Sequence, residues 1–184
     1  MKTRQKHGTR SGFRYKLMAF GFKLRDILHP RKQVLAEIGV KAGSQVLDYG
    51  CGPGGYVLPM VKLIGKNGTL YALDINPMAI EMVKSLAAKH KLSNVRTILS
   101  GCDTGLKPGS IDVVLLYDIL HHLKNDTQIL KELHRVLKPQ GILSVNDHHM
   151  EENQIISQII QGRLFKLKIV GKKTTNFNKV DKKK

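Results

Sequence analysis

Residues 46–56 read VLDYGCGPGGY, a short apolar run that leads into a turn containing four glycines. Gly50, Gly52 and Gly55 have the spacing G-x-G-x-x-G, and they lie between a predicted strand and a predicted helix. Glycine lets the backbone turn sharply and lets a ligand approach it closely, while the start of a helix offers unpaired amide donors. The stretch therefore predicts a site for a dinucleotide or for another adenosine-bearing cofactor.

Three aspartates distinguish between these cofactors. Asp48 lies two positions before Gly50, where its charge would repel a pyrophosphate and attract an ammonium or sulfonium group. Asp74 ends the next predicted strand and can accept hydrogen bonds from both ribose hydroxyls. Asp103 follows the third strand, where it can accept a hydrogen bond from the adenine amine. Each one alone could equally be a turn or capping residue. Together, at successive strand ends, they favour a positively charged adenosyl cofactor.

The rest of the chain alternates between strand and helix patterns. Apolar runs predict strands at 45–49, 69–74, 94–99, 112–117 and 142–146. Helical spacing predicts helices at 56–64 and from Pro77 onward. Asp126 can cap a further helix that runs to Leu137, and Pro139 and Gly141 would end it. Residues 164–180 predict an antiparallel hairpin that closes the sheet. The predicted fold class is therefore α/β, with a Rossmann-like, doubly wound sheet.

Length and composition predict one cytoplasmic domain. A chain of 184 residues is long enough for a single buried core, and it contains no run of 18 apolar residues that could span a membrane. The basic start has no following apolar core or cleavage site, so we do not expect a secretory signal. Cys51 and Cys102 lack metal-ligand spacing and are expected to be reduced thiols.

The net charge of +17 comes from the two ends of the chain. Residues 1–33 contain ten basic side chains and one acidic, and residues 161–184 contain nine and one, whereas the middle is neutral. Basic ends can serve solubility alone, or they can attract nucleic acid or an anionic membrane surface. We expect a basic N-terminal segment at 1–29, partly disordered or a lid over the site, a domain at 30–180 and a basic tail at 181–184.

Residues 30–180 resemble a class I S-adenosylmethionine-dependent methyltransferase. Residues 46–55 match the first motif of that family, and LYALDIN at 70–76 matches its ribose-binding segment. DVVLLYDILHHL at 112–123 and LKELHRVLKPQGIL at 130–143 match the fourth-strand motif and the helix and turn into the fifth strand. The resemblance implies seven strands in the order 3-2-1-4-5-7-6 with the last antiparallel, S-adenosylmethionine as cofactor, and S-adenosylhomocysteine as product.

The resemblance also implies where the cofactor lies. Its methionine end would lie near the glycine turn, its ribose on Asp74, and its adenine between Ile75 and the pair Cys102-Asp103. The methyl group would point past Tyr117 and Asp118 toward an acceptor pocket. The expected cofactor-binding residues are Asp48, Gly50, Cys51, Gly52, Gly55, Asp74, Ile75, Cys102, Asp103, Tyr117 and His122.

Catalysis would be direct displacement of the methyl group by the acceptor, with a base only where the acceptor must lose a proton. The candidate catalytic residues are His148 and His149, which follow the fifth strand, and Asp118, which follows the fourth. His121 and His122 are further candidate bases, and Asp147 could orient His148 or His149. These side chains also suggest a transition metal, but adjacent histidines do not readily share one ion, so we predict no metal.

The acceptor is less constrained by the sequence. Where many nucleic-acid amine methyltransferases have Asn-Pro-Pro-Tyr, this chain has YDIL at 117–120, and no cysteine follows the fourth or fifth strand. The motifs look more like those of ubiquinone and menaquinone carbon methyltransferases, which favours a small-molecule acceptor. Two alternatives remain open, an RNA or ribosomal-protein methyltransferase that uses the basic ends and a non-catalytic S-adenosylmethionine-binding module. The sequence does not predict the oligomeric state.

Overall fold

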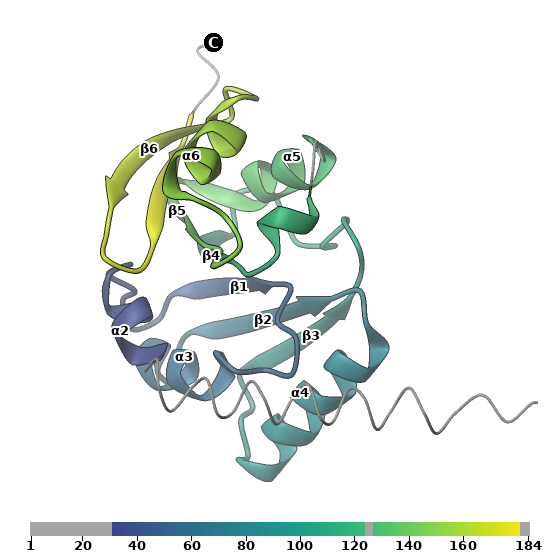
Figure 1. The fold of residues 1–184 in the computed structure, drawn as a ribbon. Coiled ribbons are helices and arrows are strands. Elements are labelled where there is room, and N and C mark those ends of the chain that lie inside the picture. Colours follow the sequence, from purple (N-terminus) through teal and green to yellow (C-terminus); the bar gives the residue numbers. More distant parts are fainter. Residues whose placement is uncertain (1–30, 124–126, 181–184) are drawn as a thin grey trace, which may run out of the picture.

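A mixed sheet of seven strands forms the centre of the protein, in the order β3-β2-β1-β4-β5-β7-β6 (Figure 1). The structure is a computed structural model that describes residues 31–123 and 127–180. The segment at 1–29, the helix cap predicted at Asp126 and the tail at 181–184 therefore lie outside the described residues, and the expectations for them stay predictions.

The strand order and directions confirm the predicted fold class. Both pairings of β7, with β5 and with β6, are antiparallel, and the other neighbouring strands are parallel. The strands are β1 Gln45–Tyr49, β2 Thr69–Asp74, β3 Val95–Leu99, β4 Ile111–Tyr117, β5 Leu137–Asn146, β6 Phe165–Val170 and β7 Thr175–Lys179.

Helices cover both faces of the sheet and create two apolar clusters. On one face lie α2 Arg31–Ala36, α3 Val57–Ile64 and α4 Pro77–Lys89, and on the other lie α5 Thr127–Val136 and α6 Glu152–Ile160 (Figure 1). A short 3-10 helix, η1 Leu120–His122, follows β4. Strand β4 is central and supplies side chains to both clusters, as its apolar run predicts.

Local signals at the start of α4 fix the end of β2. Asn76 caps the helix, because its side chain accepts a hydrogen bond from the backbone amide of Met78 at 2.9 Å. Pro77 follows at the first helical position, where its missing N–H costs no hydrogen bond. The helix therefore begins three residues after Asp74 and holds that aspartate at the carboxyl edge of the sheet.

The predicted boundary between the fifth helix and the fifth strand is wrong. Helix α5 ends at Val136 and β5 begins at once with Leu137, so Pro139 and Gly141 lie inside the strand. Leu137 pairs with Ile111, and after a register shift Ile142 pairs with Val113. The irregular stretch between these pairs accommodates the proline, which regular strand pairing would not.

None of the helices formed by the described residues is long and apolar enough to cross a bilayer.

Candidate active site

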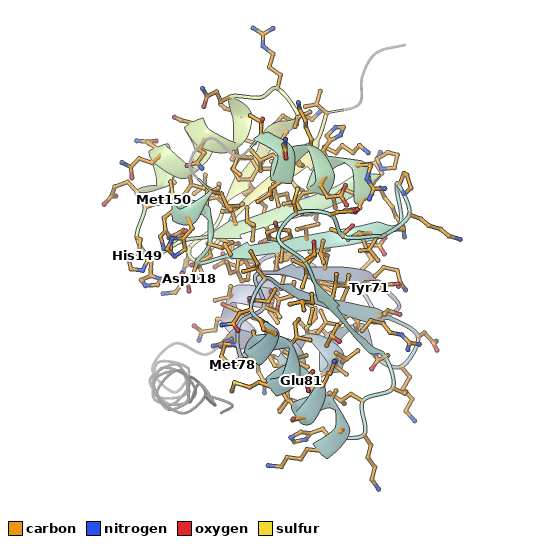
Figure 2. All side chains as sticks on the ribbon, turned by 90° about the vertical axis from the view of Figure 1, so that its right-hand side faces the viewer. Tyr71, Met78, Glu81, Asp118, His149 and Met150 are labelled. Carbon is orange, nitrogen blue, oxygen red and sulfur yellow. The ribbon has the colours of Figure 1, made fainter. Side chains whose placement is uncertain are left out.

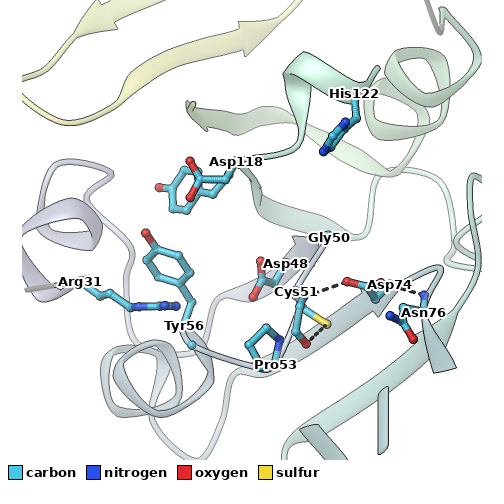
Figure 3. A pocket seen from close by; sticks show the side chains of 13 residues that line it. Arg31, Asp48, Gly50, Cys51, Pro53, Tyr56, Asp74, Asn76, Asp118 and His122 are labelled. Carbon is cyan, nitrogen blue, oxygen red and sulfur yellow. Dashed lines mark hydrogen bonds between the residues drawn. The ribbon is translucent and has the colours of Figure 1, made fainter. Parts of the chain in front are cut away.

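A pocket of about 300 Å³ opens at the carboxyl ends of β1, β2 and β4 (Figure 3). Nine of its lining residues are predicted site residues: Asp48, Gly50, Cys51, Gly52, Gly55, Asp74, Tyr117, Asp118 and His122. Sequence reasoning missed four others: Arg31, Pro53, Tyr56 and Asn76. Asn76 had a signal, since it precedes the helix-starting Pro77, but nothing in the sequence brings Arg31 to a turn more than twenty residues away.

The glycine turn presents its backbone to the pocket. The amides of Gly50 and Cys51 both donate to the carbonyl of Leu73, at 2.8 and 2.9 Å, which ties the turn to the end of β2. Gly50 has a φ of 82° and Gly52 a φ of 51°, backbone angles that residues with a side chain rarely adopt. A Cβ atom on Gly52 would meet no atom within 4 Å, so this part of the turn faces open space.

Asp74 is held by the turn that it faces. Its Oδ2 accepts a hydrogen bond from the amide of Gly52, and its Oδ1 accepts one from the amide of Asn76, both at 2.8 Å. Each carboxylate oxygen can accept a second hydrogen bond. The carboxylate is therefore oriented, and it can bind two neighbouring hydroxyls of a ligand.

Asp48 is an incompletely satisfied carboxylate at the base of the pocket. Asp48 is 2% exposed, and within the described part of the chain its buried Oδ2 has no hydrogen-bond partner. Burial raises the pKa of Asp48 to about 7, with a smaller rise from the charge of Asp74, while the Arg31 guanidinium acts in the opposite direction. A ligand with a cationic group would supply what this carboxylate lacks.

Arg31, the first residue of α2, reaches across the glycine turn. Its guanidinium carbon lies 4.5 Å from the centre of the Tyr56 ring, a cation–π distance. A Cβ atom on Gly55 would overlap the same guanidinium, so glycine is needed there for the approach. The Arg31 guanidinium therefore lines the same pocket as the carboxyl groups of Asp48 and Asp74 (Figure 3).

Tyr117 closes the pocket at the end of β4. Its hydroxyl lies 2.9 Å from the Ser144 hydroxyl, and its ring meets the edge of the Tyr56 ring with centroids 4.9 Å apart. Burial raises the pKa of the Tyr117 phenol well above its ordinary value, so the group stays neutral.

Three predicted adenine-side residues lie outside the pocket lining. Ile75 is 73% exposed and packs beside Gly101, where a Cβ atom would lie 3.1 Å from the Ile75 Cδ1. Cys102 is partly buried, and exposed Asp103 accepts a hydrogen bond from the amide of Gly105 at 2.9 Å. The ends of β2 and β3 bring these residues close to one another, on a surface next to the pocket.

The histidines after β4 and β5 form two pairs with carboxylates. The Nδ1 of His148 lies 2.5 Å from Asp118 Oδ1, and the His148 amide donates to the same oxygen at 3.3 Å. Asp118 has a φ of 53°, an unusual value for a residue with a side chain. This conformation places the Asp118 carboxylate where it both lines the pocket and holds His148.

Asp147 is the second carboxylate, and its ring partner differs from the predicted one. Its oxygens lie 3.0 and 2.8 Å from the Nδ1 of His121, and the backbone amide of His149 donates to Oδ1 at 3.0 Å. Burial alone would raise the pKa of Asp147, but these hydrogen bonds lower it below its ordinary value. Asp147 therefore meets the ring of His121 and the backbone of His149, because η1 folds His121 over the end of β5.

The four imidazoles form a row of tilted ring contacts. The ring centres of His122 and His121 lie 3.9 Å apart, those of His121 and His149 4.5 Å, and those of His149 and His148 3.9 Å. His122 is the member that lines the pocket, and Asp118, His149 and Met150 lie at the same end of the molecule (Figure 2). Across residues 31–123 and 127–180, no three His, Cys, Asp or Glu side chains are arranged to hold a metal ion.

Comparison with known proteins gives one family match. The family model described as "Methyltransferase domain" matches residues 40–181. A demethylmenaquinone methyltransferase of Lactobacillus johnsonii is 29% identical over 68% of this chain. A ubiquinone/menaquinone biosynthesis C-methyltransferase of a Marinomonas species is 26% identical over 74% of the chain. These alignments cover 52% and 55% of the relatives, so the chain spans about half of their length.

A solved structure agrees with the sequence comparisons. A SAM-dependent methyltransferase from Aquifex aeolicus superimposes with a TM-score of 0.70 and 25% identity, covering 80% of this chain and 87% of that one.

Proposed function

The chain belongs to the methyltransferase-domain family, and from this premise we propose that it transfers the methyl group of S-adenosylmethionine, the cofactor of its class, to a small-molecule acceptor. Asp48 is the observation that carries the proposal. A buried carboxylate with an unsatisfied oxygen disfavours an anionic pyrophosphate and favours a ligand with a cationic group. S-adenosylmethionine has an ammonium and a sulfonium group.

The charges around the pocket complement the two ends of this cofactor. Asp48 would attract the ammonium group, Arg31 would bind the methionine carboxylate, and Asp74 would accept both ribose hydroxyls. The exposed side chain of Ile75 would be covered by the adenine, near Cys102 and Asp103. Cys51 and His122 would line the adenosine side, and Tyr117 would lie beside the sulfur. When bound, the cofactor supplies an electrophilic methyl group.

Calorimetry of the full chain with S-adenosylhomocysteine and with NAD tests the cofactor assignment. We expect S-adenosylhomocysteine to bind and NAD not to bind. Asp74→Asn should weaken S-adenosylhomocysteine binding by roughly 100-fold, because it removes a charge-assisted acceptor for the ribose. Asp112→Asn is the matched control, since Asp112 also accepts a backbone hydrogen bond, from the Gln45 amide, but lies at the opposite end of the sheet. Binding of NAD instead would overturn the proposal.

The acceptor that we propose is a reduced quinone or a chemically similar hydroxylated ring. This proposal rests on the names of the relatives, which act on demethylmenaquinone or in ubiquinone and menaquinone biosynthesis. The test supplies the purified chain with methyl-labelled S-adenosylmethionine and reduced 1,4-naphthoquinone, and separately with a cell lysate that is then fractionated. Label in the quinol or the lipid fraction supports the proposal. Label in RNA or protein would overturn the quinol proposal and identify RNA or protein as the acceptor. The absence of label from every fraction would indicate a non-catalytic binding module.

We further propose that His148, held by Asp118, accepts the proton that the acceptor loses. A hydroxylated ring becomes a stronger nucleophile when its hydroxyl is deprotonated. The Asp118 carboxylate accepts a hydrogen bond from Nδ1–H of His148, which leaves Nε2 as the basic nitrogen. His149, the other predicted base, has its ring stacked between His121 and His148 and so supports the pair.

Two measurements test the role of His148. Nitrogen NMR of the neutral ring should show the proton on Nδ1, and Asp118→Ala, which removes the acceptor, should abolish that preference. His148→Ala should lower methyl transfer at least tenfold with S-adenosylhomocysteine binding unchanged, and added imidazole should restore part of the rate. His90→Ala, which alters an exposed histidine at the end of α4, is the control. A proton on Nε2, or a loss of activity that imidazole does not rescue, would contradict the role.

A further inference from the structure

Strand β6 and the residues around it expose an unusual number of aliphatic side chains. Within the described chain, eight large hydrophobic side chains are exposed, and four of them lie between residues 160 and 170. They are Ile160 at 40% exposure, Leu167 at 43%, Ile169 at 55% and Val170 at 37%. Only the first residue of β6 is buried, because the strand forms an outer edge of the sheet (Figure 1).

Basic side chains surround these aliphatic groups. Residues 161–180 contain six Lys or Arg and no Asp or Glu. One of the six, Lys179, donates inward to the carbonyl of Leu137. The other five are exposed, and we call them together with the four aliphatic side chains the β6 surface. The five are Arg163, Lys166, Lys168, Lys172 and Lys173.

The aliphatic groups point to both sides of the sheet. Cross-strand partners share a face, and Leu167 pairs with Phe177, which faces α5 and α6. A register shift separates Leu167 from Ile169, which pairs with Asn176 and therefore faces the opposite side. A partner that covered one face would leave the other side chain in water. A medium that surrounds the edge would cover both.

We propose that the β6 surface docks onto a membrane that contains anionic lipids. Its aliphatic side chains would enter the interfacial region, and its lysines would bind lipid phosphates. Nucleic acid fits less well, because no aromatic side chain is exposed on β6 for base stacking. A second copy paired edge to edge would bring two rows of lysines together.

Docking would bring the pocket close to the lipid. The turn after β6 is bound by Glu37, which accepts hydrogen bonds from the amides of Lys173 and Thr174 at 3.0 and 2.9 Å. Glu37 directly follows α2, whose first residue Arg31 lines the pocket, and Figure 1 shows α2 beside this turn. An apolar acceptor could then reach the site from the membrane. This consequence rests on the proposed function, whereas the docking itself does not.

Co-sedimentation of the full chain with lipid vesicles tests the docking. We expect binding to vesicles of phosphatidylcholine and phosphatidylglycerol in equal amounts, weakening with salt, and little binding to phosphatidylcholine alone. Lys166→Glu with Lys168→Glu should weaken binding by at least about 30-fold, since each lysine near an anionic surface contributes about 1 kcal/mol. Leu167→Ser with Ile169→Ser should weaken it by at least about tenfold.

Matched variants on α3 and the turn after it distinguish an effect of the β6 surface from a general effect of net charge or of exposed leucines. Lys62→Glu with Lys66→Glu changes the net charge equally, and Leu58→Ser with Leu63→Ser removes leucines of 39% and 41% exposure. Equal losses in both sets, or no vesicle binding by the unaltered chain, would overturn the proposal. Hydrogen exchange of unaltered protein should also show slower exchange of β6 amides with anionic vesicles. S-adenosylhomocysteine calorimetry on every variant distinguishes this failure from failure of the proposed function.

Discussion

At the scale of single residues, the pocket contains two carboxyl groups, Asp48 and Asp74, that can accept more hydrogen bonds than the described part of the protein donates to them. Asp74 is oriented by two amides, whereas Asp48 is buried with a pKa raised to about 7 from 3.8. Without ligand, the folded protein therefore keeps a proton on Asp48 up to about pH 7, while the unfolded chain loses it near pH 4. This carboxylate lowers the folding stability as the pH rises between these two values.

Cofactor binding should release a proton from Asp48. A cationic group favours the ionised carboxylate, so binding at about pH 6 should release close to one proton, and binding at about pH 8 should release almost none. The affinity should rise with pH up to about 7 and then level off. Calorimetry with S-adenosylmethionine in two buffers of different ionisation enthalpy measures this release.

The variant Asp48→Asn provides the control for proton release. It should bind the cofactor more weakly at all pH values and release no proton. Without ligand it should be more stable than the unaltered protein above pH 7, by up to about 4 kcal/mol, because no buried charge forms. Proton release that persisted in Asp48→Asn would mean that another group titrates.

The sequence predicts which residues lie together where their positions depend on local order along the chain. Asp48, Gly50, Gly52 and Asp74 lie at strand ends that apolar patterning predicts, and the structure gathers them in one pocket. Their roles toward the cofactor stay proposals. Arg31 could not be predicted, because its position depends on how α2 packs.

At the scale of secondary-structure elements, the glycine turn depends on a close contact with the segment after β4. A Cβ atom on Gly50 would lie 2.7 Å from the Cδ1 of Ile119, next to Asp118. Gly43 has a similar φ of 84° but nothing within 4 Å of such an atom. An alanine at Gly43 would therefore introduce backbone strain alone, whereas an alanine at Gly50 would introduce both backbone strain and steric overlap.

Both glycine-to-alanine variants should lose stability, and Gly50→Ala should lose more. Backbone strain alone should cost about 1–2 kcal/mol in Gly43→Ala. Overlap with Ile119 should add about 1 kcal/mol or more in Gly50→Ala. Adding Ile119→Val to Gly50→Ala removes the Cδ1 atom and should abolish most of the difference. Chemical denaturation of the unaltered protein, the two single variants and the double variant measures their free energies of unfolding. Equal losses of stability in Gly43→Ala and Gly50→Ala would refute the steric contribution.

Element boundaries were predictable where the signal is local. The second strand has its predicted bounds, 69–74, and α4 begins at Pro77 as expected. The junction of α5 and β5 was predicted wrongly, because Pro139 and Gly141 suggest a turn whereas pairing of Leu137 with Ile111 starts the strand earlier. That pairing joins residues far apart in the chain, so no local pattern indicates it.

At the scale of the whole molecule, Glu37 links the end of α2 to the hairpin of β6 and β7. Its Oε2 accepts hydrogen bonds from two backbone amides and from the Thr174 hydroxyl at 3.0 Å. Loss of this carboxylate would leave partly buried donors without an acceptor.

Glu37→Ala should destabilise the protein by about 1–3 kcal/mol and speed hydrogen exchange in β6 and β7. Glu37→Gln keeps an oxygen acceptor and should have a smaller effect. The control is Glu81→Gln, which alters an exposed ion pair with Lys84 and should change stability by less than about 1 kcal/mol. Unchanged exchange in the hairpin of Glu37→Ala would show that Glu37 does not stabilise it.

The position of β7 between β5 and β6 affects how the chain can fold during synthesis. The ribosome delivers β1, β2 and β4, which carry the pocket, well before it delivers β7. The pocket half of the sheet can therefore pair while translation continues, since N-terminal parts of a chain fold first. The edge that β6 provides must wait, because β6 joins the sheet only through β7. A nascent chain would form the pocket first and the β6 edge last.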